Sequence, residues 1–281
     1  MRLILSRKGF DSAAGGCPSP IFPDGSMLSL PIPSKGSPHR YSQLSWRGHN
    51  VGELVERLTR GKVRRDFDAH LDPDLRRDLC PRPGDWRAAF GQVSSAQGHL
   101  RKQGVAEGDL FLFWGLFRRV DEQGRWIGRP EHHLWGWMQV GLVAPVDAVV
   151  RKGGASWSWA RGHPHLHRPE DPTNTLYLAA EHLRLPKLSH PLPGAGTFDV
   201  AQASRRLSCA AARTPSEWCL PEGFKTRREA PPLSYHADSA RWSQAHGRTH
   251  LRVVSRGQEF VLNLDRYPGV VDWVAGVIGV G

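Results

Sequence analysis

Residues 108–117 read GDLFLFWGLF, in which a Gly-Asp pair opens a run of eight residues without a charged side chain. Residues 135–143 read WGWMQVGLV, in which large apolar side chains alternate with glycine or a polar side chain over much of the stretch. The first run predicts a fully apolar strand, and the second predicts a strand with two different faces. The charged segment between them contains Gly124 and Gly128, which favour a turn.

Shorter strand signals lie on both sides of this pair. Residues 1–5 predict a buried strand, residues 27–30 and 175–179 predict two more, and residues 251–264 contain two short strands or one bent pair. Residues 186–232 are rich in Pro, Gly, Ser and Arg, which is typical of an irregular insertion.

Two helices are predicted in the first half of the chain. Asn50 can cap a helix from Val51 to about Thr59, and a second helix begins near Ser94. Together with the strand pattern, these helices predict an α+β protein with a mixed or barrel-like sheet and flanking helices. We expect a single domain over residues 1–281.

The chain is strongly basic, with a formal charge of +11 and a pI near 10.1. Of its 38 basic residues, 31 are Arg, the side chain best suited to phosphate and guanine edges. Such an excess favours a polyanionic partner, because neutralised phosphates release their counterions. A GC-rich genome is the alternative explanation, since its codons raise Arg, Ala, Gly and Pro together.

The cysteine pattern predicts free thiols. Cys17, Cys80, Cys209 and Cys219 contain no C-x-x-C pair, so a cysteine-built zinc site is not expected. Spread thiols and the lack of a signal-peptide core predict a cytoplasmic protein. The apolar stretch at residues 270–281 is too short to span a membrane.

A polar cluster follows the first strand at Arg7, Lys8, Asp11 and Ser12. Open sheets commonly present ligand-binding groups at such a strand end. Arg7 and Lys8 are suited to hold a phosphate, and Asp11 to act as a base or to orient a nucleophile. The alternative is a surface turn in which Asp11 pairs with Arg7 or caps backbone amides.

Five carboxylate or imidazole side chains fall within nine residues: Asp66, Asp68, His70, Asp72 and Asp74. They could bind a divalent cation or form an acid–base pair. A solvated turn that caps a helix from about Leu75 is the alternative, and it suits Asp74. We therefore select His70 and Asp72 as catalytic candidates.

Three histidines alternate at His163, His165 and His167. On an extended segment they would point to one side, which suits a metal, but no acidic or thiol partner is evident. We therefore expect no metal here, and expect His163 and His165 to contact a phosphate or a base. Gln97 and His99 could also read a base edge, although such helix residues often face water.

Tryptophans interleaved with Arg could stack bases, and Trp114 is a candidate wall of a base pocket. The alternative is a core role, in which Trp135 and Trp137 alternate with Gly136 and face the same side of one strand.

Several strings of this sequence resemble the third type of nucleotide modification associated domain, a family of bacteria and phages described as DNA base modification enzymes. The similarity runs from residue 1 to about 180 and resumes near residue 256, whereas residues 188–229 resemble nothing. The strings are SRKGFD (6–11), PSP (18–20), PDG (23–25), AHLDPDL (69–75), AQGHL (96–100), GDLFLFW (108–114), GHPH (162–165) and RGQEFV (256–261).

A weaker likeness concerns the fold. Residues 104–180 are similar to the barrel core of PUA-like domains, including those that bind modified or flipped bases. A base-directed protein needs an extruded nucleotide and a pocket with stacking walls.

These resemblances imply a nucleic-acid base or nucleotide modifying enzyme, acting on DNA rather than RNA. Its expected catalytic groups are Asp11, His70 and Asp72. Two alternatives stay open: a non-enzymatic reader of modified DNA or RNA, and a hydrolase of phosphodiester or glycosidic bonds in a defence system. The sequence identifies no cofactor and no oligomeric state.

Overall fold

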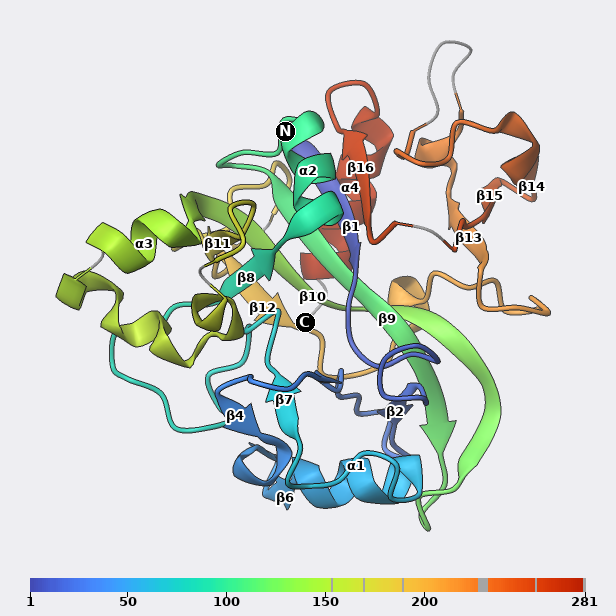
Figure 1. Ribbon diagram of the computed structural model, residues 1–281. Coiled ribbons are helices and arrows are strands. Elements are labelled where there is room, and N and C mark those ends of the chain that lie inside the picture. Colours follow the sequence, from blue (N-terminus) through green and yellow to red (C-terminus); the bar gives the residue numbers. More distant parts are fainter. Residues whose placement is uncertain (153, 169, 189, 227–231, 256, 280–281) are drawn as a thin grey trace.

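A sheet curled into a half-barrel forms the centre of the computed structural model (Figure 1). The structure describes residues 1–152, 154–168, 170–188, 190–226, 232–255 and 257–279. Within these residues the strand order is β16-β1-β9-β10-β11-β8, while β2 pairs with β9 and β12 with β10. The strand bounds are β1 Arg2–Arg7, β2 Ser19–Ile21, β8 Ala89–Gln92, β9 Leu110–Val120, β10 Trp126–Pro145, β11 Thr175–Ala179, β12 Ala195–Thr197 and β16 Glu259–Asn263. The predicted α+β class with a mixed sheet is confirmed.

Strand β1 lies between one parallel and one antiparallel neighbour. It runs parallel to β9, from Leu3 opposite Leu110 to Arg7 opposite Trp114, and antiparallel to β16 on its other side. Its residues 3–6 are buried, and Arg7 is half-buried. The polar residues that follow therefore emerge where the strand leaves the sheet.

Each face of the sheet packs against its own group of apolar residues. Along β9, Leu110 and Leu112 belong to one group, whereas Phe111 and Phe113 belong to the other. All four side chains are fully buried. The run is apolar throughout because both faces of this strand are covered.

Trp135 and Trp137 do not share a face, contrary to the expectation from their alternation with Gly136. The pairing of β10 with β9 shifts by one residue between Leu134 and Gly136. This β-bulge places Trp135 in one apolar group and Trp137 in the other.

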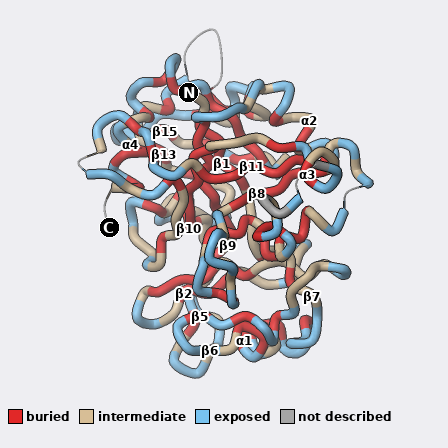
Figure 2. Tube along the Cα trace, turned by 90° about the vertical axis from the view of Figure 1, so that its left-hand side faces the viewer, coloured by how far each residue is buried: buried red, intermediate tan, exposed pale blue. Residues whose placement is uncertain are grey.

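A smaller lobe, built mainly from residues 28–80, lies at the bottom of both views (Figures 1 and 2) and packs against the far end of β9 and β10 at Val120 and Trp126. Its helix α1 (Val51–Thr59) has the predicted bounds, and the Asn50 side chain accepts a hydrogen bond from the Glu53 backbone at 3.1 Å. The lobe also contains the following short elements: β3 Ile32–Pro33, β4 His39–Arg40, η1 Tyr41–Gln43, β5 Ser45–Trp46, β6 His49–Asn50 and β7 Asp68–His70.

One strand predicted in this lobe is missing from the described structure, and so is the helix that the alternative interpretation of Asp74 required. Residues 27–30 make a single β-bridge, between Met27 and Ile21, in place of a strand. No helix begins near Leu75. The Asp74 carboxylate is instead buried against Arg82 and Trp86, so it is not available to cap one.

The segment at residues 186–232, expected to be irregular, contains two strands in its described part. β12 joins the central sheet, and β13 (Glu217–Pro221) forms a second sheet with β15 (Arg248–Arg252) and β14 (Trp242–Ala245). Trp218 and Leu220 of β13 enter the core that also contains α4 (Pro268–Gly279). Their burial explains the ordered backbone of a segment whose composition resembles a linker.

Helix α2 (Ser94–Lys102) begins at the predicted residue, and α3 (Val146–Lys152) follows β10. The remaining helical turns are 3-10 in type: η2 Gly154–Gly162, η3 Pro164–His167, η4 Ala203–Arg205, η5 Glu222–Phe224 and η6 Ser239–Arg241. None of the helices in the described part of the chain combines the length and the apolar character that a membrane span requires.

Candidate active site

Six of the side chains selected from the sequence line one cavity of about 170 Å³: Arg7, Lys8, Asp11, His70, Asp72 and His165. They come from three distant segments of the chain. The end of β1 supplies the first three, the end of β7 supplies His70 and Asp72, and η3 supplies His165. The candidate groups thus converge on one site.

The Asp72 carboxylate forms the centre of this site. Three imidazoles face it: Nε2 of His163 lies 3.4 Å from Oδ1, and Nε2 of His165 and of His70 lie 3.6 and 4.0 Å from Oδ2. The backbone N–H of Gly91 donates a hydrogen bond to Oδ1 at 2.7 Å. One buried carboxylate is therefore surrounded by four nitrogens.

These contacts determine how the Asp72 carboxyl ionises. Burial by itself would raise its pKa, but the side chains of His163 and His165 outweigh this effect and hold the pKa well below the usual range. Asp72 is thus a carboxylate at neutral pH. It can orient imidazoles and stabilise a positive charge on any of them.

His70 has the opposite behaviour. Burial lowers its pKa from 6.5 to about 4, and the opposing charge of Asp72 recovers only part of that loss. At neutral pH its imidazole is therefore uncharged. An uncharged imidazole beside a carboxylate can accept a proton from a substrate or from water.

His163 and His165 reach Asp72 because their segment is a turn, which corrects the extended conformation expected from the sequence. Residues 164–167 form the 3-10 helix η3, and the centroids of the two rings lie 5.6 Å apart. Pro164 occupies the first position of this helix, where its fixed φ is favourable. His167 is exposed and bonds to a backbone carbonyl instead.

The orientation of the His165 ring is fixed by its neighbours Asn174 and Gly91. Its Nδ1 lies 2.6 Å from Oδ1 of Asn174, whose amide nitrogen donates back to the His165 carbonyl at 2.8 Å. A Cβ atom on Gly91 would lie only 2.2 Å from the His165 ring. Strand β8 thus requires glycine at this position to admit the imidazole.

The positive charge of the cavity comes chiefly from two arginines. The Arg7 side chain makes no hydrogen bond or ion pair with another described residue. Arg168, which was not selected from the sequence, also lines the cavity and donates to Ser34 at 2.9 Å. Both residues line the cavity, and a guanidinium group suits an anionic ligand. The charge of Arg168 contributes to the lowered pKa of His70, whereas the charge of Arg7 contributes to the lowered pKa of the buried His132.

Lys8 is already paired. Its Nζ lies 2.9 Å from Oε1 of Glu259, which also accepts a hydrogen bond from the Gln92 amide at 2.6 Å. Glu259 is 1% exposed. Because both charges are largely buried, loss of either partner would leave the other uncompensated at a cost of about 3–5 kcal/mol. Lys8 therefore contributes less free charge to the cavity than the sequence suggests.

Asp11 and Ser12 separate in the structure. One oxygen of Asp11 accepts hydrogen bonds from the backbone of Ala13 and Ala14, both at 2.8 Å, while the residue still lines the cavity. Ser12 is exposed and does not line it. Asp11 therefore caps backbone amides, as the alternative interpretation expected, and also lines the cavity.

Three other selected residues lie elsewhere. Gln97 is buried in α2, where its side-chain oxygen Oε1 accepts a hydrogen bond from the Tyr177 hydroxyl at 2.9 Å. His99 lies 3.0 Å from the Ser234 hydroxyl. Trp114 is 1% exposed and packs edge-on against Trp218, so its ring has no free face on which a base could stack.

A divalent cation would find three donors in the site. One ligand atom each from His70, Asp72 and His165 lies within 4.8 Å of the others. Neutral imidazoles and a carboxylate are suitable ligands for several divalent ions. The arrangement therefore supports proton transfer, and its donor set is also compatible with a metal.

The cavity has room for about one small ring. A cavity of about 150 Å³ takes up one benzene molecule, so about 170 Å³ admits a ring of pyrimidine size. The tryptophans expected to stack on a base do not line it. Its walls instead carry imidazole, amide, carboxylate and guanidinium groups.

Comparison with known proteins identifies the family and no individual relative. No curated protein and no solved structure matches the chain. The model of the family described as nucleotide modification associated domain 3 matches residues 2–263, a range that spans residues 188–229 as well. The chain therefore belongs to the nucleotide modification associated domain 3 family.

Proposed function

We propose that this protein is an enzyme that modifies a base or nucleotide of nucleic acid, with DNA as its substrate, and that the cavity around Asp72 is its active site. The supporting observation is the convergence of Arg7, Asp11, His70, Asp72 and His165 on one small cavity. The family name implies a role in nucleotide modification, and the charge of +11 suits a polyanionic substrate.

In the proposed mechanism the two arginines position the substrate. Arg7 and Arg168 bind a phosphate next to the reacting nucleotide, because guanidinium groups match phosphate oxygens in charge and geometry. The size of the cavity selects a single extruded ring. The PUA-like likeness of residues 104–180 would place the base against the sheet, but Trp114 and Trp135 are buried there. We therefore place the base beside His70.

Proton transfer is assigned to His70 and Asp72. The neutral His70 imidazole takes a proton from a nucleophilic group of the substrate or from water, and the Asp72 carboxylate stabilises the imidazolium that forms. His163 and His165 hold Asp72 ionised and in place. Asp11, which has one carboxylate oxygen in backbone hydrogen bonds, would orient the nucleophile.

The test compares nucleosides from cells that express the wild-type chain, Asp72→Asn or the control Asp66→Asn. Asp66 is exposed and pairs with Arg64, outside the cavity. After enzymatic digestion of the DNA, mass spectrometry should show a nucleoside of altered mass with the wild type and the control. The Asp72→Asn variant should lack it, while its melting temperature shows that it is folded. Identical nucleoside profiles for all three proteins would refute the proposal.

A further inference from the structure

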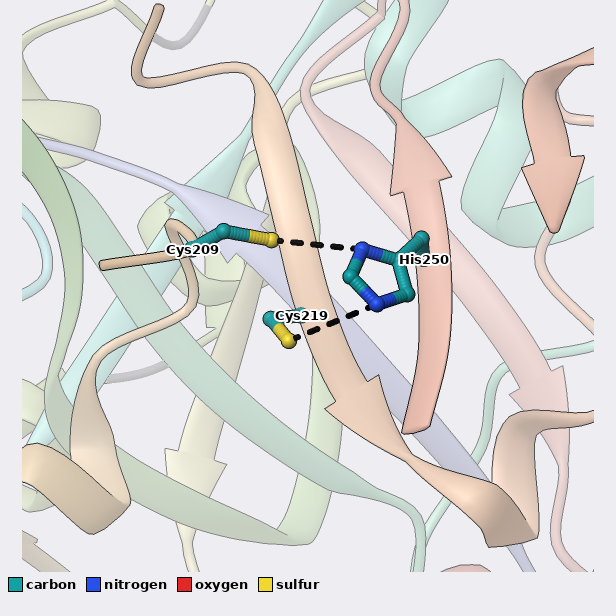
Figure 3. Close-up of side chains that lie close together, drawn as sticks. All are labelled: Cys209, Cys219 and His250. Carbon is teal, nitrogen blue, oxygen red and sulfur yellow. Dashed lines mark hydrogen bonds between the residues drawn. The ribbon is translucent and has the colours of Figure 1, made fainter. Parts of the chain in front are cut away.

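Two cysteines and a histidine meet on the outer face of the second sheet (Figure 3). The Cys209 sulfur lies 3.6 Å from Nδ1 of His250, and the Cys219 sulfur lies 3.9 Å from Nε2 of the same ring. With one ligand atom taken from each residue, the three atoms lie within 4.8 Å of one another. None of them lines the Asp72 cavity.

The pairing of the strands brings these residues together. Cys219 of β13 is directly opposite His250 of β15. On the other side of β13, Ser208 forms a bridge with Trp218, and the Cys209 backbone N–H donates to the Glu217 carbonyl at 2.8 Å. The three side chains therefore occupy neighbouring positions across one face of the sheet.

The opposite face of this sheet is the one that packs in the core. Trp218 and Leu220 alternate with Cys219, and Leu251 follows His250; all three apolar residues are buried. Cys219 and His250 are half-buried, as is Cys209.

The donor set and its spacing suit zinc. Zinc binds thiolate sulfur at about 2.3 Å and imidazole nitrogen at about 2.0–2.1 Å with tetrahedral angles, which places sulfur and nitrogen about 3.6 Å apart. The contact between Cys209 and Nδ1 of His250 already has this length. The two sulfurs now face different nitrogens of the ring, so the Cys219 side chain must turn toward Nδ1 for both sulfurs to bind one ion.

We propose that Cys209, Cys219 and His250 bind one zinc ion that joins the segment around Cys209 to the sheet of β13 and β15. Two thiolates and one neutral imidazole leave the fourth tetrahedral position to water. The ion stabilises the local fold, because a metal bound by two segments holds them together. This assignment replaces the expectation of no cysteine-built zinc site, which rested only on the spacing of cysteines along the chain.

The proposal predicts zinc in the protein purified under reducing conditions. Elemental analysis should find about one zinc ion per wild-type chain, and less than roughly a tenth of this in Cys209→Ser and His250→Ala. Cys80→Ser is the matched control, because Cys80 is buried in the smaller lobe and should leave the zinc content unchanged.

A second measurement serves if the variants fail to fold. Wild-type protein in which cobalt(II) replaces the metal should show thiolate-to-cobalt charge-transfer absorption, and zinc should displace this signal. Wild-type protein that binds neither ion after reconstitution would overturn the proposal. So would a disulfide between Cys209 and Cys219 in the metal-free protein that persists in reducing buffer, because it would assign the pair to redox chemistry.

Discussion

The low pKa of His70 makes the stability of the protein depend on pH, and His70→Gln should remove the part of this dependence that is due to His70. In the unfolded chain the imidazole has a pKa of about 6.5, whereas burial lowers it to about 4 in the fold. Between these values the unfolded chain binds the additional proton, so stability falls as the pH falls from 6.5 to about 4. The full effect is about 3 kcal/mol, at about 1.4 kcal/mol per pKa unit. Between pH 7.5 and pH 5 the loss due to His70 is about 2 kcal/mol.

Urea unfolding of the wild type and His70→Gln at both pH values, in buffer with EDTA, measures this difference. Other buried histidines contribute to the wild-type dependence, among them His132, whose pKa burial lowers to about 3. The comparison must therefore be made between the two proteins, and the exposed His49→Gln is the control. If the wild type and His70→Gln lose the same stability between pH 7.5 and pH 5, the imidazole does not titrate as its burial predicts.

Three further predictions concern the salt dependence of DNA binding, the different roles of Leu5 and Arg7, and the packing of His165 against Gly91. If about five phosphates are contacted, a fourfold rise in salt should weaken DNA binding by two to three decades in a fluorescence anisotropy titration, and a flat response would exclude phosphate recognition. Leu5→Ala should cost about 2–5 kcal/mol, because Leu5 is fully buried, whereas Arg7→Ala should weaken nucleotide binding with a much smaller loss. Equal losses in thermal unfolding would make Arg7 a structural partner. Gly91→Ala should displace the His165 ring and lower activity at least tenfold, at a stability cost of about 1–3 kcal/mol; wild-type activity would show that this ring position is not needed.

Local patterns in the sequence predicted the elements whose residues interact with near neighbours. The cap at Asn50 and the apolar periodicity after it were sufficient for α1, because both depend on contacts within one helix. Strand β11 likewise has the predicted bounds, since its run of apolar side chains is buried throughout. Residues 186–232 were harder to interpret, because Trp218 and Leu220 are buried by partners that lie far away in the sequence.

The sequence was sufficient to select most of the side chains of the site, but it did not show how they are arranged in space. His70 and Asp72 lie close in sequence, but their approach to His165 depends on the turn at η3 and on the absence of a side chain at Gly91. Arg168 gave no signal, because an exposed arginine after a histidine cluster is ordinary in a chain with 31 of them. Nonlocal pairing decides such contacts, and sequence spacing does not reveal it.

Strand β1 pairs with β16, and this pairing has a consequence for synthesis on the ribosome. Leu3 pairs with Leu262, so β1 lacks its antiparallel neighbour until about 260 further residues have been translated. At about 5–20 residues per second that interval is roughly 13–52 s. During it the nascent strand exposes an unpaired edge of apolar residues, which is a site for aggregation. The cavity beside Arg7 is also lined by Gln258, which precedes β16. A nascent or truncated chain that lacks this region would therefore have an incomplete cavity.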